Sequence, residues 1–251
     1  MTMNHKPSVQ LYTVRDHMSE REQTLTRLAE LGYTAVEPFD PTTDPKGFRA
    51  LTDGLGLAVS GAHAMAMLHE ADPAPVFEAV AILGTDLAIL PAGIPEESFT
   101  TYDGLKHAAD LLNTLAARAA EHGLRLGYHN HWWEFEPVLD GRHALEVLVD
   151  LTAPEVVFEI DTYWAAVGGA DPVAVLERLG ERVVALHVKD GPIVKGEPHV
   201  AVGAGAMPVP AILAAASADA WPIVELDTCA TDIFEALGRS LAYLDALGAG
   251  A

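Results

Sequence analysis

The chain has little of what several classes of protein require. Its 251 residues contain one cysteine, Cys229, so no internal disulfide forms, and this usage is typical of a reducing compartment. No apolar run approaches the roughly 18 residues that a membrane span needs. The segment MTMNHKPSVQ lacks the apolar core of a signal peptide. We therefore expect a cytoplasmic protein with no membrane partner.

Positive charge is scarce as well. Lys and Arg number 15 against 36 Asp and Glu, which gives a formal net charge of −21. Such a surface repels phosphate backbones, so a nucleic-acid partner is not expected. Hydrophobic residues make up 50% of the chain and charged residues 20%, a composition that supports a sizeable folded core.

Short apolar runs alternate with helical stretches along the sequence. The runs are rich in Val, Ile and Leu, as strands buried on both faces should be. The expected strands are 8–14, 34–39, 57–64, 86–92, 124–131, 156–161, 183–190 and 222–227. Helical periodicity is clearest at 21–32, 102–123, 170–180 and about 232–247. Gly32 is a typical helix stop, and Asp171 followed by Pro172 is a typical helix start.

Eight strand–helix units without a long linker fit one closed (β/α)8 barrel, the TIM barrel, with residues 1–251 as a single domain. An open, doubly wound sheet is the alternative. Such sheets carry a Gly-rich phosphate-binding turn after the first strand, where this chain reads YTVRDHM. We therefore expect the barrel.

Polar side chains gather where the expected strands end. Active sites of such barrels lie at the carboxyl ends of the strands, because the βα loops meet there. Residues two apart on a strand share a face. Strand two ends near Glu37 and strand three at His63. The later strands end in four same-face pairs: His129 with His131, Glu159 with Asp161, His187 with Lys189, and Glu225 with Asp227.

A divalent metal ion is the simplest partner for these groups. Buried carboxylates are costly unless they are paired or bound to a cation. Mixed carboxylate and imidazole ligands suit Mn²⁺, Co²⁺, Fe²⁺, Zn²⁺ or Mg²⁺, and the sequence does not choose among them. A single His or Asp at a strand end is more often a satisfied or turn-forming residue. The metal prediction therefore depends on four neighbouring strands ending in such residues.

At these residues the chain resembles the sugar phosphate isomerase/epimerase superfamily, the xylose isomerase-like (β/α)8 barrels. The shared motifs extend over nearly the whole chain in the expected order. The element Tyr128-His129-Asn130-His131, with Glu134-Phe135 following, is typical of a bacterial branch. The other motifs are VQLYTVRD from Val9, GAHA from Gly61, EIDTYWAAVGGADP from Glu159, LHVKDG from Leu186 and VELD from Val224.

The resemblance implies one divalent metal ion held from strands five to eight. Asp161, His187 and Glu225 stand where the family's Asp, His and Glu ligands stand. Many relatives have a glutamate ligand on strand five, where this chain has His129. We choose His129, with His131 and Glu134 as the alternatives.

The chain also departs from its relatives after strand seven. Relatives often read GEG there, whereas this chain reads GAG, with Ala204 at the glutamate position. The contact that the glutamate supplies is therefore missing, and the substrate or the oligomer contact is open to change.

The resemblance implies isomerisation or epimerisation of a small sugar or keto-sugar. The ion would polarise a carbonyl and stabilise the enediolate formed when a neighbouring carbon loses its proton. Glu225 is the expected general base, with His131 or Glu134 as the opposing acid or base. Two roles are equally expected for Lys189. It stabilises an oxyanion, or it forms a salt bridge with Glu159 in the barrel interior.

The expected partner is a small carbohydrate. His63, Glu134 and Trp164 are the expected substrate contacts. Trp132, Trp133 and Trp164 follow strand ends, where they would stack on an apolar sugar face or pack beneath a loop.

Other functions stay open at this stage. A lyase or dehydratase would use the same enolate and expel water or an aglycone from a keto-sugar, an inosose or a 3-keto-glycoside. A metal-dependent endonuclease of the same superfold is disfavoured by the charge of −21. A non-catalytic sugar-binding protein is a further alternative. The sequence determines neither the substrate nor the oligomeric state, a homo-oligomer included.

Overall fold

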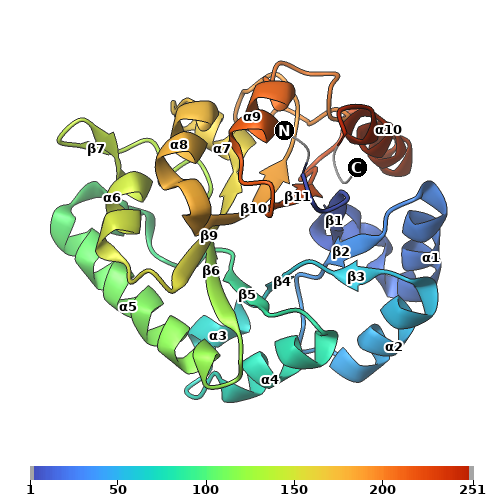
Figure 1. Cartoon of the computed structure of the whole chain (residues 1–251), viewed down its shortest axis with the longest axis horizontal. Coiled ribbons are helices and arrows are strands. Elements are labelled where there is room, and N and C mark those ends of the chain that lie inside the picture. Colours follow the sequence, from blue (N-terminus) through green and yellow to red (C-terminus); the bar gives the residue numbers. More distant parts are fainter. Residues whose placement is uncertain (1–2, 249–251) are drawn as a thin grey trace.

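Helices surround a ring of parallel strands (Figure 1). The computed structural model describes residues 3–248. Nine strand segments form one sheet in the order β3-β2-β1-β11-β10-β9-β6-β5-β4. Their bounds are β1 Ser8–Gln10, β2 Ala35–Glu37, β3 Ala58–Val59, β4 Ala62–His63, β5 Leu87–Leu90, β6 Arg125–His129, β9 Val156–Asp161, β10 Val183–Val188 and β11 Trp221–Val224.

The third expected strand closes the barrel in two pieces. Its first piece, β3, pairs with β2, and its second piece, β4, pairs with β5. The two pieces are separated by Ser60 and Gly61 alone, so the ends of the sheet meet through one bent strand. The predicted (β/α)8 TIM barrel is confirmed, with its third strand divided.

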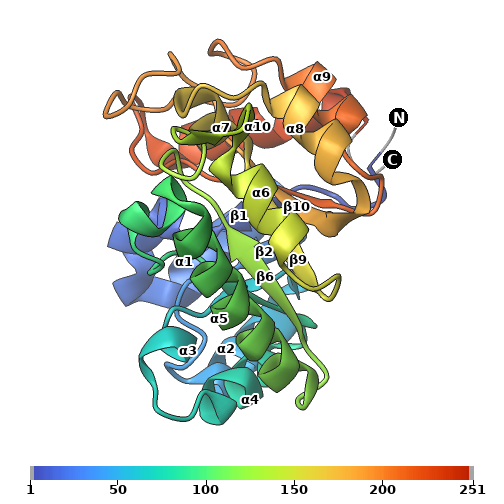
Figure 2. The same cartoon turned by 90° about the vertical axis from the view of Figure 1, so that its left-hand side faces the viewer.

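The helices follow the strands in the predicted alternation, and Figure 2 shows α5 and α6 along one side of the barrel. A small antiparallel hairpin, β7 (Val138–Leu139) with β8 (Arg142–His143), precedes α6. The α-helices are α1 Arg21–Leu31, α2 Pro45–Leu55, α3 Ala66–His69, α4 Ala74–Leu83, α5 Tyr102–Ala120, α6 Ala144–Leu151, α7 Thr162–Val167, α8 Pro172–Leu179, α9 Val209–Ala215 and α10 Ile233–Ala246. The 3₁₀ segments are η1 Leu11–Glu20, η2 Glu96–Thr100 and η3 Gly180–Arg182.

Local sequence explains where several helices begin and end. Gly32 adopts a φ of 106° after α1, and its N–H donates to the carbonyls of that helix's last turn. The Asp171 carboxylate accepts from the backbone N–H of Val173 at 3.0 Å, which caps α8. Within residues 3–248, no helix combines the length and the apolar character needed to cross a bilayer.

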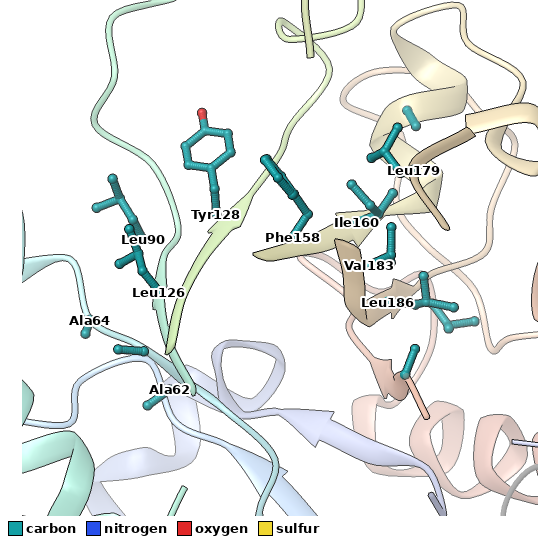
Figure 3. Packing of buried hydrophobic residues seen from close by; sticks show 14 of the residues in the cluster. Ala62, Ala64, Leu90, Leu126, Tyr128, Phe158, Ile160, Leu179, Val183 and Leu186 are labelled. Atoms are coloured by element: carbon teal, nitrogen blue, oxygen red, sulfur yellow. The ribbon is translucent and has the colours of Figure 1, made fainter. Parts of the chain in front are cut away.

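The main core lies between the strands and the helices. Figure 3 shows Leu90, Leu126, Phe158 and Ile160, which extend from neighbouring strands into this core. A second, smaller cluster contains Leu87, Ile89 and Val157 on the other face of the same strands, inside the barrel. On β9 the interior face therefore changes from apolar at residue 157 to acidic at residues 159 and 161.

Gly61 permits the bend in the third strand to pack closely against the barrel interior. A Cβ at this position would lie 2.8 Å from Glu37 Oε1 and 3.0 Å from Ile89 Cδ1. Both neighbours are fully buried. We expect Gly61→Ala to lower the free energy of unfolding by about 1–3 kcal/mol, as overpacking does. Urea unfolding monitored by circular dichroism measures the change.

Gly54→Ala is the matched control. Gly54 lies within α2, and a Cβ there would have no neighbour within 4 Å. Alanine should stabilise this exposed helix position by about 0.5–1 kcal/mol. Equal effects of the two substitutions would contradict the role assigned to Gly61.

Candidate metal centre and active-site cavity

The carboxyl ends of the strands place ionisable side chains inside the barrel. The strands approach one another there, so residues far apart in sequence become neighbours. Each of these residues is at most 6% exposed. They are Glu37 from β2, His63 from β4, His129 from β6, Glu159 and Asp161 from β9, His187 from β10, and Glu225, which directly follows β11.

Four of these residues lie close enough to share one ion. His129, Asp161, His187 and Glu225 each offer a donor atom, and the four atoms lie within 4.8 Å of one another. His187 Nδ1 is 2.7 Å from Glu225 Oε2, and His129 Nε2 is 4.0 Å from Asp161 Oδ2. The Asp161 Oδ2 atom is buried, and the Lys189 ammonium lies 2.8 Å from it. Two buried imidazoles and two buried carboxylates that converge in this way are a donor set that fits a divalent ion.

Asn130 fixes the relative position of two of these residues. Its side chain turns away from His129, as strand alternation predicts. The amide accepts from the backbone N–H of Asp161 at 3.0 Å and donates to the carbonyl of Asp161 at 3.2 Å. These two bonds tie the end of β6 to the end of β9.

Lys189 is buried among carboxylates. Its Nζ atom lies 2.8 Å from Asp161 Oδ2 and 2.7 Å from both Glu225 Oε2 and Asp227 Oδ2. Of the two roles considered for Lys189, the ion pair with Glu159 does not form, because Glu159 faces the imidazoles of the cluster instead. Burial alone would lower the pKa of Lys189, but the three carboxylates outweigh it and hold the pKa well above its usual range.

The imidazoles differ in charge. Burial would lower the pKa of His187, but Glu159 and Glu225 outweigh it and raise the pKa well above 6.5. Burial and the nearby His187 lower the pKa of His129 to about 3. Burial, with His129 next, lowers the pKa of His131 to about 2. At neutral pH, His187 is therefore a cation in the metal-free chain, whereas His129 and His131 are neutral.

The carboxylates of the ligand group differ as well. Burial raises the pKa of Asp161 to about 6, with the cations Lys189 and His187 acting in the opposite direction. Burial also acts to raise the pKa of Glu225, but Lys189 and His187 outweigh it there and hold that pKa well below its usual range. Glu225 is therefore ionised at neutral pH.

A cavity of about 330 Å³ opens above this cluster. Its lining combines ionisable side chains with apolar and aromatic ones. Lys189, Glu225 and Asp227 line it together with three imidazoles. The complete lining is Tyr12, Phe39, His63, Met65, Pro91, Ala92, His129, His131, Lys189, Glu225 and Asp227.

Two residues expected to contact a substrate are not among the lining residues. Glu134 is buried, and its carboxylate accepts from the Tyr128 hydroxyl and from the backbone N–H of His131, both at 2.8 Å. Burial raises the pKa of Glu134 to about 8 despite these bonds. The Trp164 ring lies 5.3 Å from Lys189 Nζ, outside the cavity lining. His63 and His131, in contrast, both line the cavity.

The sequence reasoning did not identify several residues in or near the cavity. Tyr12, Phe39 and Met65 line the cavity, each beyond the end of an early strand. Their residue types do not indicate catalysis or metal binding. Their position just after a strand end is the feature of the sequence that could have indicated a place in the site. His199 comes from the loop after β10 and accepts from the backbone N–H of Asp227 through Nδ1 at 3.1 Å. No spacing in the sequence links these two residues.

A sequence model of the xylose isomerase-like TIM barrel family matches residues 25–246. The chain belongs to this family. The family accounts for the order of strands and helices and for the location of the polar cluster at the carboxyl ends of the strands.

Individual relatives are distant. The chain is 27% identical over 205 residues to an inosose dehydratase of Geobacillus kaustophilus, covering 70% of this chain and 63% of that protein. It is 25% identical over 188 residues to the rhizopine catabolism protein MocC of Rhizobium meliloti, covering 67% of this chain and 57% of that protein. The matches therefore span about three fifths of the length of these curated relatives.

Among solved structures, a sugar phosphate isomerase/epimerase from Parabacteroides distasonis is similar over 98% of this chain and 95% of its own. The TM-score is 0.75 and the sequence identity is 26%. This likeness extends over the whole barrel, so the family's fold is complete in this chain.

The charge of His187 predicts that metal binding releases a proton. In the metal-free chain the ring carries protons on both nitrogens, since its pKa lies well above 6.5. A bound ion must replace the proton on one nitrogen, so affinity should rise with pH, by up to about tenfold per pH unit. Isothermal titration of Mn²⁺ between about pH 6 and pH 8, in buffers of different ionisation enthalpy, measures both effects. An affinity independent of pH, without proton release, would contradict the prediction.

Proposed function

We propose that this protein is a divalent-metal-dependent isomerase or epimerase of a small sugar or keto-sugar. The observation that carries the proposal is the convergence of His129, Asp161, His187 and Glu225 beside a cavity of about 330 Å³. That volume lies in the range of small-molecule sites, roughly 300–1,000 Å³. The cavity also contains His131, a neutral imidazole that lies outside the ligand group.

The four converging residues would hold the ion. When bound, a divalent ion stabilises the negative charge that develops on a carbonyl oxygen as the neighbouring carbon loses its proton. Tyr12, Phe39 and Met65 line the cavity and would contact the carbon face of a sugar.

Proton transfer would be shared between Glu225 and His131. Lys189 and His187 both contact Glu225 through Oε2, which leaves Oε1 to accept a proton from a bound carbon acid. His131 lines the same cavity and would return a proton from another direction. The bond from the His131 backbone N–H to Glu134 and the stacking of its ring on Trp133, at 4.2 Å between centroids, hold this imidazole in place.

Lys189 would stabilise developing negative charge on the substrate. Its ammonium group lines the cavity and is charged at any physiological pH. The three carboxylates that contact it fix its position, so little reorganisation is needed during the reaction.

A dehydratase is the second candidate, because the inosose dehydratase of Geobacillus kaustophilus is a relative at 27% identity. The first step is the same proton removal. The outcome then depends on whether a leaving group occupies the next carbon, since its loss yields an enone instead of a reprotonated sugar.

The proposal includes a small carbohydrate as the partner and the cytoplasm as the location. The net charge of −21 argues against nucleic acid as a ligand. The single cysteine supports a reducing compartment.

Metal removal should abolish activity. A chelator should lower turnover by about 1,000-fold or more, and added Mn²⁺ or Co²⁺ should restore it. Asp161→Asn should lose bound metal, measured by inductively coupled plasma mass spectrometry. Asp171→Ala, which removes the cap of α8, should cost about 1 kcal/mol of stability and retain metal and activity. Full activity in a metal-stripped preparation would refute the proposal.

The shared proton-removal step identifies the reaction. We expect hydrogen–deuterium exchange at a substrate carbon when the metal-loaded protein is incubated in deuterated water with a panel of ketoses, inososes and 3-keto-glycosides. His131→Gln should slow this exchange by about 100- to 10,000-fold with metal content unchanged. An ultraviolet-absorbing enone product would select the dehydratase over the isomerase. Sugar binding without any exchange would instead indicate a non-catalytic binding protein.

A further inference from the structure

One carboxylate oxygen inside the barrel is contacted by three imidazoles. Glu159 Oε1 lies 2.7 Å from His63 Nε2, 3.0 Å from His129 Nδ1 and 3.0 Å from His187 Nε2. Glu159 is fully buried on β9, two residues before Asp161 and on the same face of that strand. A charged group in this position needs partners of opposite charge or hydrogen-bond donors, and the three rings supply them.

Two of these rings turn their other nitrogen toward the carboxylates of the ligand group. His187 Nδ1 is 2.7 Å from Glu225 Oε2, and His129 Nε2 is 4.0 Å from Asp161 Oδ2. An imidazole that binds a metal through one nitrogen carries its proton on the other. The negative charge of Glu159, 3.0 Å from one nitrogen of each ring, therefore favours the proton on that nitrogen and leaves the other nitrogen free for an ion.

We propose that Glu159 is a positioning residue that holds the proton of both ligand imidazoles on the side away from the ion. His129 then binds through Nε2 and His187 through Nδ1. This inference rests on the proposed metal centre and assigns a role to a residue outside the four ligands. Because one carboxylate holds both rings, a single change at Glu159 disturbs half of the ligand set.

Glu37 provides a useful contrast. Its Oε2 atom contacts His187 Nε2 at 2.8 Å and accepts from the Gln10 side chain at 2.7 Å. Glu37 therefore forms the hydrogen bond of one ligand ring, whereas the charge of Glu159 lies 3.0 Å from a nitrogen of both ligand rings. His63 contacts both carboxylates, at 2.7 Å from Glu159 and 3.4 Å from Glu37, and so links them.

A second position for the ion would use Glu159 and the imidazole nitrogens that face it as ligands. His63, His129, Glu159 and His187 also offer donor atoms within 4.8 Å of one another. An ion among them would take the ring nitrogens that face Glu159. It would also leave the buried carboxylates of Asp161 and Glu225 with the ammonium of Lys189 and the Nδ1 proton of His187 as their close partners, and without the charge of the ion. The charge distribution therefore favours an ion on the side of Asp161 and Glu225.

Glu159→Gln tests the inference through metal affinity. Glutamine keeps one acceptor oxygen, but its amide group donates, and a donor facing an imidazole N–H favours the wrong tautomer. We expect the affinity for Zn²⁺ and Mn²⁺, measured by competition with a chelator, to fall by about 10- to 100-fold. Glu37→Gln should cause a smaller loss. Thermal unfolding of each metal-free variant separates lost affinity from lost stability.

Glu146→Gln is the matched control. Glu146 is also buried, at 8% exposure, but it accepts from the backbone N–H of His143 at the start of α6. This variant should bind metal as the wild type does. Wild-type affinity in Glu159→Gln would overturn the inference and leave the metal centre in place. A wild-type chain that binds no divalent ion would instead refute the proposed function.

The wild-type protein allows a test without any variant. In a ¹⁵N-histidine-labelled, Zn²⁺-loaded sample, nuclear magnetic resonance should show the His129 proton on Nδ1 and the His187 proton on Nε2. Protons on the opposite nitrogens would overturn the inference, and so would an ion ligated by Glu159 itself. This measurement decides the question even if Glu159→Gln does not fold.

Discussion

The contact of one buried ammonium group with three carboxylates is the constraint on which the active-site end of the barrel depends. Lys189 Nζ lies within 2.8 Å of Asp161, Glu225 and Asp227. These groups come from three neighbouring strands or the residues just beyond them, so the ammonium joins β9, β10 and β11 electrostatically at their carboxyl ends. Removing such charges from water costs several kcal/mol each unless they are paired. The remaining carboxylates need further positive charge, which the imidazoles supply and which a bound divalent ion would increase.

In the barrel, the apolar residues that stabilise the fold lie apart from the polar residues of the candidate site. Leu87, Ile89 and Val157 form the smaller apolar cluster inside the barrel, below the polar cluster. The main core lies outside the strands. Burial of these side chains contributes stability at about 25 cal/mol per Å². The carboxyl ends are therefore free to contain buried carboxylates, although these lower stability. Gly61 shows how closely the two parts meet, since its missing side chain leaves room for Glu37.

The family defines a fold and a site location, whereas the residues in the site define the chemistry. Lys189, Glu225 and His131 line the same cavity, and in the proposed function they would remove and return a proton at carbon. That step is common to isomerases, epimerases and dehydratases. Specificity must come from the rest of the lining, where Tyr12, Phe39 and Met65 occupy the loops after β1, β2 and β4.

The sequence by itself determined the eight strand–helix units, the caps at Gly32 and Asp171, and the placement of ligand-type residues at neighbouring strand ends. These features follow from local periodicity and backbone preferences. Only the tertiary structure decided which side chains meet. It paired Lys189 with Asp161 and not with Glu159, and it placed Glu134 behind His131. Such contacts join residues as distant as Glu37 and His187, 150 positions apart, and depend on strand register and side-chain rotamers that no local pattern encodes.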